Sequence, residues 1–112
     1  MTKEELIELL DETNIDVSEG EQDDIQEKNR FPRLIFFDYV WDFHEASSDV
    51  YSTTVSYQIS FFSRNPRDSI FISLIKKFID KKVNMTNIQK EFIENGSYWH
   101  YYFSIEILEN IL

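Results

Sequence analysis

The segment from Tyr51 to Arg64 alternates between two kinds of side chain, and this alternation constrains the fold more than any other feature of the sequence. One set is mostly large and apolar, and the other is mostly small and polar. The first set is Tyr51, Thr53, Val55, Tyr57, Ile59 and Phe61, and the second is Ser52, Thr54, Ser56, Gln58, Ser60 and Phe62. Because successive side chains of a β-strand point to opposite faces, the pattern predicts an antiparallel sheet with one face in a core and the other exposed.

The preceding segment, from Leu34 to Phe43, is rich in aromatic and β-branched residues and is also predicted to be a strand. Strict alternation places one set of side chains on each face. These sets are Ile35, Phe37, Tyr39, Trp41 and Phe43, and Leu34, Phe36, Asp38, Val40 and Asp42. The stretch from His44 to Val50 has the composition of a turn, so the two strands are expected to form a long β-hairpin.

The segment from Tyr98 to Leu108 is predicted to be the last strand. Its core face carries Trp99, Tyr101, Phe103, Ile105 and Ile107, and its other face carries Tyr98, His100, Tyr102, Ser104 and Glu106. Asn95-Gly96, just before it, is a strong hairpin signal. The apolar residues between positions 83 and 94 also fit a helical spacing, but with this turn signal we predict a strand from about Asn87 to Ile93.

Two amphipathic helices are expected. Thr2 and Glu5 form a capping box that begins a helix over residues 3–12, and Asp68 can cap a second helix that begins at Ser69. The second helix carries a wide apolar stripe that ends at Ile79. Residues 13–32 are mostly polar and acidic, so we predict a long acidic loop that can be mobile.

These elements predict one α+β domain over residues 1–112, in the order α-β-β-α-β-β. The expected architecture is a twisted antiparallel sheet of about four strands, with both helices packed on one face. No apolar run approaches the length that spans a bilayer, and the acidic start lacks a signal-peptide pattern, so we expect a soluble intracellular domain and no membrane partner.

The net charge of −10 comes entirely from the N-terminal quarter of the chain. Residues 1–27 contain eleven acids and one base, whereas residues 28–112 contain ten of each. The segment from Arg64 to Lys82 contains six basic and two acidic residues. The acidic end either keeps the chain soluble or docks on the basic segment of another copy. The overall acidity argues against binding DNA through its phosphates.

No pattern of catalytic or cofactor-binding residues is visible. His44 and His100 lack metal-ligand or triad partners at a diagnostic spacing, and two glycines cannot build a phosphate-binding loop. Asp38 and Asp42 share a predicted strand face, but an exposed sheet face explains them better than a cation site does. We therefore predict a protein that is not an enzyme and has no metal or cofactor, and a small enzyme is the least favoured alternative.

Some aromatic residues remain outside the predicted core. Strict alternation leaves Phe36, Phe62, Tyr98 and Tyr102 on the faces opposite to the core, where they would form an apolar patch. Such a patch is typical of a contact surface. The alternative is that the helix over residues 3–12 covers it.

The order of these elements and the residue composition of the strands resemble those of a known family. A Thr-Lys-Glu-Glu-Leu helix leads through an acidic loop to an aromatic strand. A Tyr-Ser-Thr-Thr-Val-Ser-Tyr-Gln-Ile-Ser-Phe-Phe-Ser strand, a Pro-marked turn, an amphipathic helix and a strand ending in Ile105-Glu106-Ile107 follow. This pattern resembles the tail terminator proteins of long-tailed bacteriophages and prophages, also called tail completion or head–tail joining proteins.

The resemblance implies a structural virion protein that assembles in the host cytoplasm. Such proteins form a ring, usually of six subunits, that caps the tail tube and joins it to the neck or head-completion protein, although a subunit can stay monomeric until it meets a tube. The predicted interface residues are Asp16, Glu19, Glu21, Asp23 and Asp24 in the acidic part, Arg64, Arg67, Lys76, Lys77, Lys81 and Lys82 in the basic part, and the aromatics Phe36, Phe62, Tyr98 and Tyr102. The competing hypothesis is an acidic DNA mimic that inhibits a nuclease or a restriction enzyme.

Overall fold

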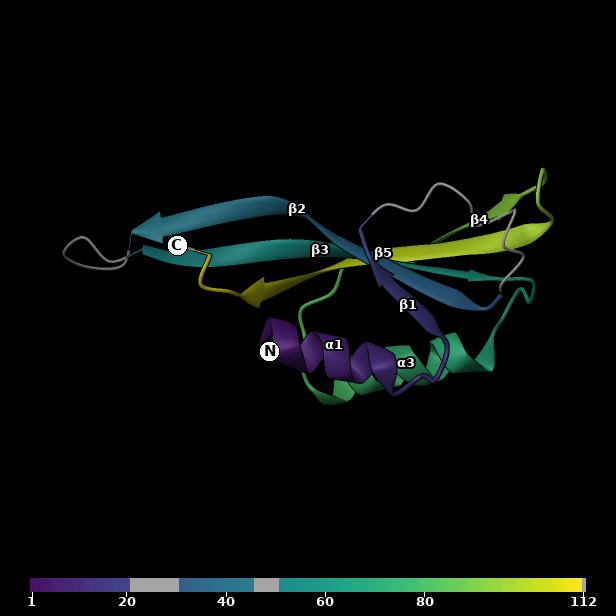
Figure 1. The fold of residues 1–112 in the computed structure, drawn as a ribbon, viewed down its shortest axis with the longest axis horizontal. Coiled ribbons are helices and arrows are strands. Elements are labelled where there is room, and N and C mark those ends of the chain that lie inside the picture. The colour runs from purple at the N-terminus through teal and green to yellow at the C-terminus, as the bar shows by residue number, and fades with distance from the viewer. Residues whose placement is uncertain (21–30, 46–50, 112) are drawn as a thin grey trace.

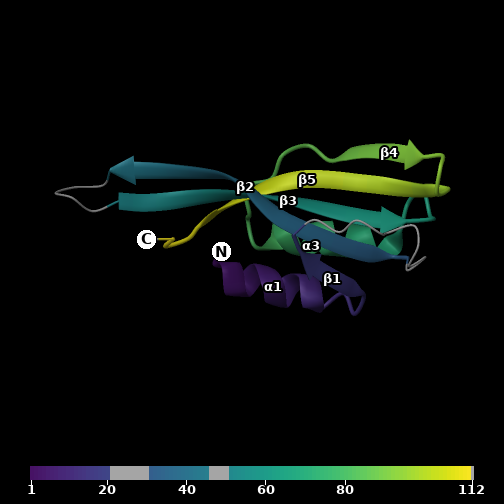
Figure 2. The same cartoon turned by 45° about the horizontal axis from the view of Figure 1, so that its top comes forward.

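The computed structural model describes residues 1–20, 31–45 and 51–111, which form a sheet with two helices on one of its faces (Figure 1). The helices are α1 (Lys3–Asp11) and α3 (Ser69–Asp80). The strands are β1 (Asp16–Glu19), β2 (Arg33–Glu45), β3 (Tyr51–Ser63), β4 (Gln89–Ile93) and β5 (Tyr98–Leu108). Figure 2 shows the two helices side by side beneath the sheet. The predicted α+β class and the placement of the helices on one face are therefore confirmed.

The sheet has five strands in the order β1-β2-β3-β5-β4, and it is mixed, not purely antiparallel. The predicted β2–β3 hairpin is present, with pairs running from Arg33 with Phe62 to Glu45 with Tyr51. The predicted strand before Asn95-Gly96 is also present as β4, which pairs with β5 through Ile93 and Tyr98. The alternation predicted for β3 and β5 agrees with their observed faces.

The prediction of one continuous loop over residues 13–32 is wrong, because β1 lies within it. β1 pairs in parallel with the start of β2, from Asp16 with Arg33 to Glu19 with Phe36. Only Val17 in this short strand favours β structure by its own propensity, so the pairing depends on the available edge of β2. Residues 21–30 of the predicted loop lie outside the described residues.

A register shift between Asp38 and Val40 corrects the strict alternation predicted for β2. Before the shift, Leu34 and Phe36 face the helices; after it, Trp41 pairs with Val55 on that same face. A β-bulge adds one residue to a strand and thereby reverses the order of the faces that follow. Phe36 lies before the bulge on the helix side and is a core residue, 3% exposed, so the prediction that placed it in an opposite-face patch is wrong.

The core lies between the helices and the covered face of the sheet. Its buried members come from both helices and from β2, β3 and β5: Leu6, Leu9, Leu10, Leu34, Phe36, Val55, Tyr57, Ile59, Phe61, Phe71, Leu74, Phe78, Tyr101, Phe103, Ile105 and Ile107. Thr2 caps α1 by accepting a hydrogen bond from the Glu5 N–H at 3.2 Å. Asp68 caps α3 by accepting one from the Ile70 N–H at 2.9 Å. Both caps were predicted.

A smaller cluster occupies the opposite face, which the helices leave open. Ile35, Phe62 and Tyr98 are buried there, and Phe31, Phe37 and Ile93 pack against them. The Phe31 and Tyr98 rings lie 5.0 Å apart. The alternative in which the N-terminal helix covers the four leftover aromatics is wrong for Phe62, Tyr98 and Tyr102, because α1 packs on the other face, where only Phe36 of the four lies.

Candidate interaction surfaces

The outer half of the β2–β3 hairpin projects past the helix layer as an arm (Figures 1 and 2). Its inner part still contributes Val55 to the core and pairs with β5 as far as Thr54 with Leu108, and only beyond that pair does the arm have two strands. We define the arm as residues 39–45 and 51–56. Its large side chains are poorly covered, since Tyr39 is 53% exposed, Trp41 is 54% exposed and Phe43 is 44% exposed. Concentrated exposure of aromatic side chains is typical of surfaces that contact another macromolecule.

Hydrogen bonds hold two of these rings in place. The Trp41 indole N–H donates to Asp38 Oδ2 at 2.5 Å, and the Tyr39 hydroxyl donates to Ser104 Oγ at 2.8 Å. Trp41 lies on the helix side of the arm, opposite Val55, whereas Tyr39 reaches across the open face to β5. The bulge therefore gives the arm an oriented aromatic side chain on each face.

The same bulge separates two carboxylates that were predicted to share a face. Asp38 pairs with Tyr57 on the helix side, and Asp42 pairs with Thr54 on the other side. That prediction is wrong, and with it the geometric basis for a cation site between the two side chains. Among the residues that the structure describes, no group of three or more His, Asp or Glu side chains could hold a metal ion.

The root of the arm is fixed by the segment that follows β5. The Tyr57 hydroxyl donates to Glu109 Oε1 at 2.6 Å, and the Glu109 N–H donates to the Thr53 carbonyl oxygen at 3.0 Å. Burial of Tyr57, together with the hydrogen bond to the Glu109 carboxylate, raises the pKa of the phenol far above its ordinary value of 10.0. Tyr57 therefore stays neutral in the folded chain and ties the C-terminal segment to the base of the arm.

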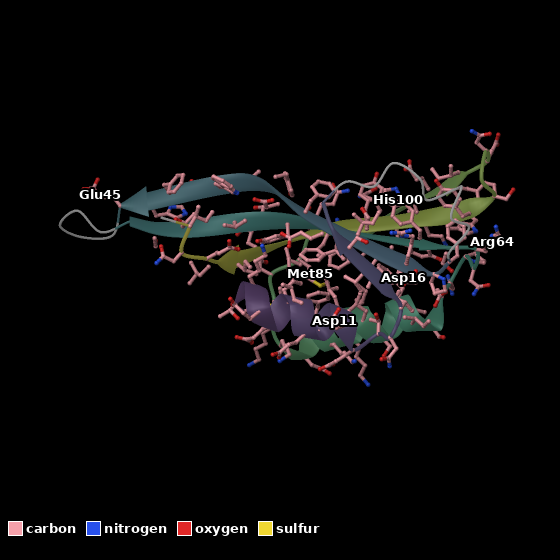
Figure 3. The ribbon with its side chains drawn as sticks, in the orientation of Figure 1. Asp11, Asp16, Glu45, Arg64, Met85 and His100 are labelled. Carbon is pink, nitrogen blue, oxygen red and sulfur yellow. The ribbon has the colours of Figure 1, made fainter. Side chains whose placement is uncertain are left out.

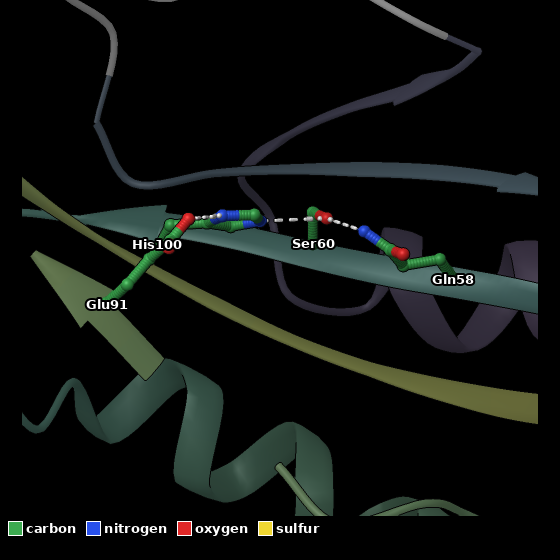
Figure 4. Close-up of polar contacts among 4 residues, drawn as sticks. All are labelled: Gln58, Ser60, Glu91 and His100. Carbon is green, nitrogen blue, oxygen red and sulfur yellow. Dashed lines mark hydrogen bonds and ion pairs between the residues drawn. The ribbon is translucent and has the colours of Figure 1, made fainter. Parts of the chain in front are cut away.

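A polar relay crosses three strands of the open face (Figure 4). His100 Nδ1 lies 3.1 Å from Glu91 Oε1, and His100 Nε2 lies 3.0 Å from Ser60 Oγ. The Gln58 amide donates to the same Ser60 oxygen at 3.1 Å. The imidazole stacks on the Phe62 ring, with centroids 4.6 Å apart and planes 9° apart. The order serine, histidine, carboxylate is that of a nucleophilic triad.

The surroundings of Ser60 do not suit nucleophilic chemistry. Ser60 is 3% exposed and lies in the middle of β3, where it pairs with Ile35 on one side and Tyr102 on the other. Its backbone therefore belongs to the sheet ladders, and neighbouring N–H groups are not free to stabilise an oxyanion. The relay satisfies polar groups at the edge of an aromatic cluster, which is a structural role.

Sequence reasoning missed this relay because its members are distant along the chain. Ser60 and His100 lie 40 positions apart, and Glu91 and His100 lie nine apart. The second pair could have been found from the Asn95-Gly96 hairpin, since its register places Glu91 directly opposite His100. The first depends on the pairing of β3 with β5.

The solvent side of α3 carries a second exposed apolar surface. Ile72 is 57% exposed and Ile79 is 60% exposed, and Lys76 lies between them on the same helix face. Lys81 and Lys82 are exposed at the C-terminal end of the helix. We call these five residues the α3 ridge. Ile72 and Ile79 make this surface apolar on either side of Lys76, and Lys81 and Lys82 add positive charge at its C-terminal end.

Two of the predicted interface charges already have partners within the chain. Lys77 Nζ lies 2.9 Å from Glu12 Oε2, which joins α3 to the end of α1. Glu19 Oε2 lies 2.8 Å from Lys3 Nζ, and this hydrogen bond raises the pKa of Lys3. Asp16 is at the start of β1. Glu21, Asp23 and Asp24 lie outside the described residues.

The other predicted residues are distributed over different parts of the fold. Phe62 and Tyr98 are buried in the open-face cluster, and Tyr102 is half-buried beside His100, with ring centroids 4.8 Å apart. Arg64 and Arg67 are exposed in the turn before α3. Figure 3 shows Arg64 at the end of the molecule opposite to Glu45, at the tip of the arm. The predicted residues therefore do not form one continuous patch.

Comparison with known proteins adds no family assignment. No family model matches the chain, and no curated protein matches it. Within the described part of the chain, no helix is long and apolar enough to cross a membrane. The arm and the α3 ridge are therefore the two exposed surfaces from which a function can be inferred.

Proposed function

We propose that the chain is a structural assembly subunit, the tail terminator of a long-tailed bacteriophage or prophage. In this role, copies of the chain form a ring on the end of the tail tube, stop its growth and present the surface to which the neck or head-completion protein binds. The element order of the sequence supports the family, and the arm supports the assembly role.

The arm is the observation that carries the proposal. Beyond the pair of Thr54 with Leu108 the arm is a two-stranded ribbon, and such a ribbon is marginally stable in water when nothing covers it. The helix-side face of the arm exposes the large aromatic rings of Trp41 and Phe43. Burying those rings against a neighbour would stabilise the arm by about 25 cal/mol for each Å² of apolar surface removed from water. A chain that keeps such a projection is suited to binding another subunit, and a ring subunit needs this property.

Charge also suits a channel through which DNA passes. The acids of α1 and the net charge of −10 give the chain a surface that repels phosphates. A ring lumen of this kind lets DNA through without binding it. The bases lie mostly on and beside α3, where α1 partly neutralises them through Glu12.

Tail tube length provides the test. Purified chain is added to tail tube protein that is polymerising, and tube lengths are measured by electron microscopy together with light scattering of the chain alone. We expect rings of the chain at tube ends and tubes that stop growing. Tubes that elongate as they do without the chain, and carry no ring, would contradict the proposal.

A matched variant makes the test specific. Trp41→Ser with Phe43→Ser removes the helix-side aromatics of the arm, and we expect it to abolish capping while circular dichroism shows an unchanged fold. Asn95→Ser, in the exposed β4–β5 turn, serves as the control and should cap tubes normally. A monomer that inhibits a nuclease, and does not bind tubes, would support the DNA-mimic hypothesis instead.

A further inference from the structure

We infer that the arm of one copy docks on the α3 ridge of a second copy of the same chain. This inference deepens the proposed function, because it assigns the contact between neighbouring subunits of the ring. It concerns two surfaces that sequence reasoning did not pair: the aromatic arm was not among the predicted interface residues, and the basic segment was paired with the acidic N-terminal part.

The exposed apolar side chains support this pairing. Among the described residues, most large apolar side chains that remain well exposed belong to the arm or the ridge, or pair with the arm. On or beside the arm they are Tyr39, Val40, Trp41, Phe43 and Leu108, and on the ridge they are Ile72 and Ile79. Each surface therefore exposes apolar side chains that a neighbouring copy can bury.

The charges of the two surfaces are complementary. Glu45 lies on the same face of the arm as Trp41 and Phe43, Asp42 lies on the opposite face, and the described arm residues include no Lys or Arg. The ridge carries three lysines, with Asp80 as the acid next to them. Asp42 Oδ2 lies 3.6 Å from His44 Nε2, a contact that becomes an ion pair only when the imidazole is protonated. Opposite charge around an apolar centre orients two partners and raises the rate at which they meet.

The two surfaces cannot meet within one chain. Both views show the arm projecting past the N-terminal end of α1, while α3 lies under the other half of the sheet (Figures 1 and 2). The contact therefore joins different copies, and it uses a different surface on each of them. Repeated contacts of this kind close into a ring or continue as an open chain.

Cysteine cross-linking can test the contact directly, because the chain has no cysteine of its own. One chain carries Glu45→Cys in the arm, on the same face as Trp41 and Phe43, and a second, of different mass because of a tag, carries Lys76→Cys on the ridge. All of these side chains are exposed, so the fold should persist. With a short bismaleimide we expect the mixture to give a cross-linked heterodimer, both in solution at high concentration and on tail tubes. Asn95→Cys replaces Glu45→Cys in the control, which should give only background.

Complementation of two defective variants gives an independent readout. Trp41→Ala with Phe43→Ala damages the arm, and Ile72→Ser with Ile79→Ser damages the ridge. We expect each variant alone to associate on the order of 30-fold more weakly than the wild type, which corresponds to loss of one hot spot. Mixed together, the two variants should form one-to-one dimers and nothing larger, because one intact arm and one intact ridge remain.

The outcomes separate this inference from the proposed function. Absence of the heterodimer in both settings, or wild-type association by both variants, would overturn the arm-to-ridge contact even if the chain caps tubes. A chain that forms the cross-link and the mixed dimer but leaves tube growth unchanged would support the contact and overturn the tail terminator proposal.

Discussion

Asp68 holds the start of α3, and replacing it with Ala should destabilise the domain more than any other single change in the turn before that helix. Its two carboxylate oxygens accept hydrogen bonds from different donors. Oδ1 accepts the Ile70 N–H at 2.9 Å, and Oδ2 accepts the Ser63 hydroxyl at 2.7 Å. Both Asp68 and Ser63 are buried, at 5% and 2% exposure, so water does not readily replace either bond.

The expected loss follows from these two contacts. Loss of an N-cap side chain costs about 1 kcal/mol, and leaving a buried hydroxyl without its acceptor costs about 1 kcal/mol more. Asp68→Ala should therefore lower the free energy of unfolding by about 2 kcal/mol. For a domain of this length that corresponds to a fall in Tm of roughly 10 °C.

Urea unfolding followed by circular dichroism and a thermal melt would measure the effect. Asp68→Asn keeps a capping oxygen and should lose less than about 1 kcal/mol, since Asn and Asp cap helices about equally well. Asp80→Ala removes an exposed acid at the other end of α3, where the helix dipole disfavours it, and should not destabilise the chain. If Asp68→Ala were as stable as either control, the proposed role of this side chain would be refuted.

Three further changes test other parts of the fold. Tyr57→Phe should cost about 1 kcal/mol at neutral pH through the lost hydrogen bond to Glu109. Above pH 10.0, the ordinary pKa of the phenol, only the unfolded wild type loses the phenol proton, so the wild type loses stability as the pH rises. Urea melts should therefore show that the difference in unfolding free energy between the wild type and Tyr57→Phe becomes smaller. Ser60→Ala removes the hydroxyl that joins Gln58 and His100 in the relay and should cost about 1 to 2 kcal/mol in the same assay, and an unchanged midpoint would argue against the structural role of the relay. Gly20→Ala should cost about 1 kcal/mol because φ is 93° there, although its Cβ would meet no atom within 4 Å, and a neutral result in a thermal melt would show that this turn relaxes.

Local patterns were sufficient to predict most elements. The alternation in β3 and β5, the caps at Thr2 and Asp68 and the hairpin signal at Asn95-Gly96 all correspond to features of the structure. Each of these signals acts over a few residues, because it depends on the side-chain period of a strand, on the unpaired N–H groups of a helix end or on the geometry of a turn.

The candidate surfaces were predictable only in part. The aromatic content of β2 and the basic character of the Arg64–Lys82 segment were evident, but Trp41 and Phe43 could not be recognised as the exposed arm. Their exposure depends on where the helix layer ends, and this follows from how α1 and α3 pack across the whole sheet.

By itself, the sequence determined the class of fold, its two helices, the long hairpin and the uneven distribution of charge. Only the tertiary structure decided that β1 joins the sheet in parallel, that the bulge after Asp38 moves Trp41 to the helix side, and that Ser60, His100 and Glu91 meet. These features arise from pairing between segments far apart in the chain. A shift of one residue in such a pairing moves every following side chain to the opposite face of the sheet, and short-range sequence patterns cannot predict that shift.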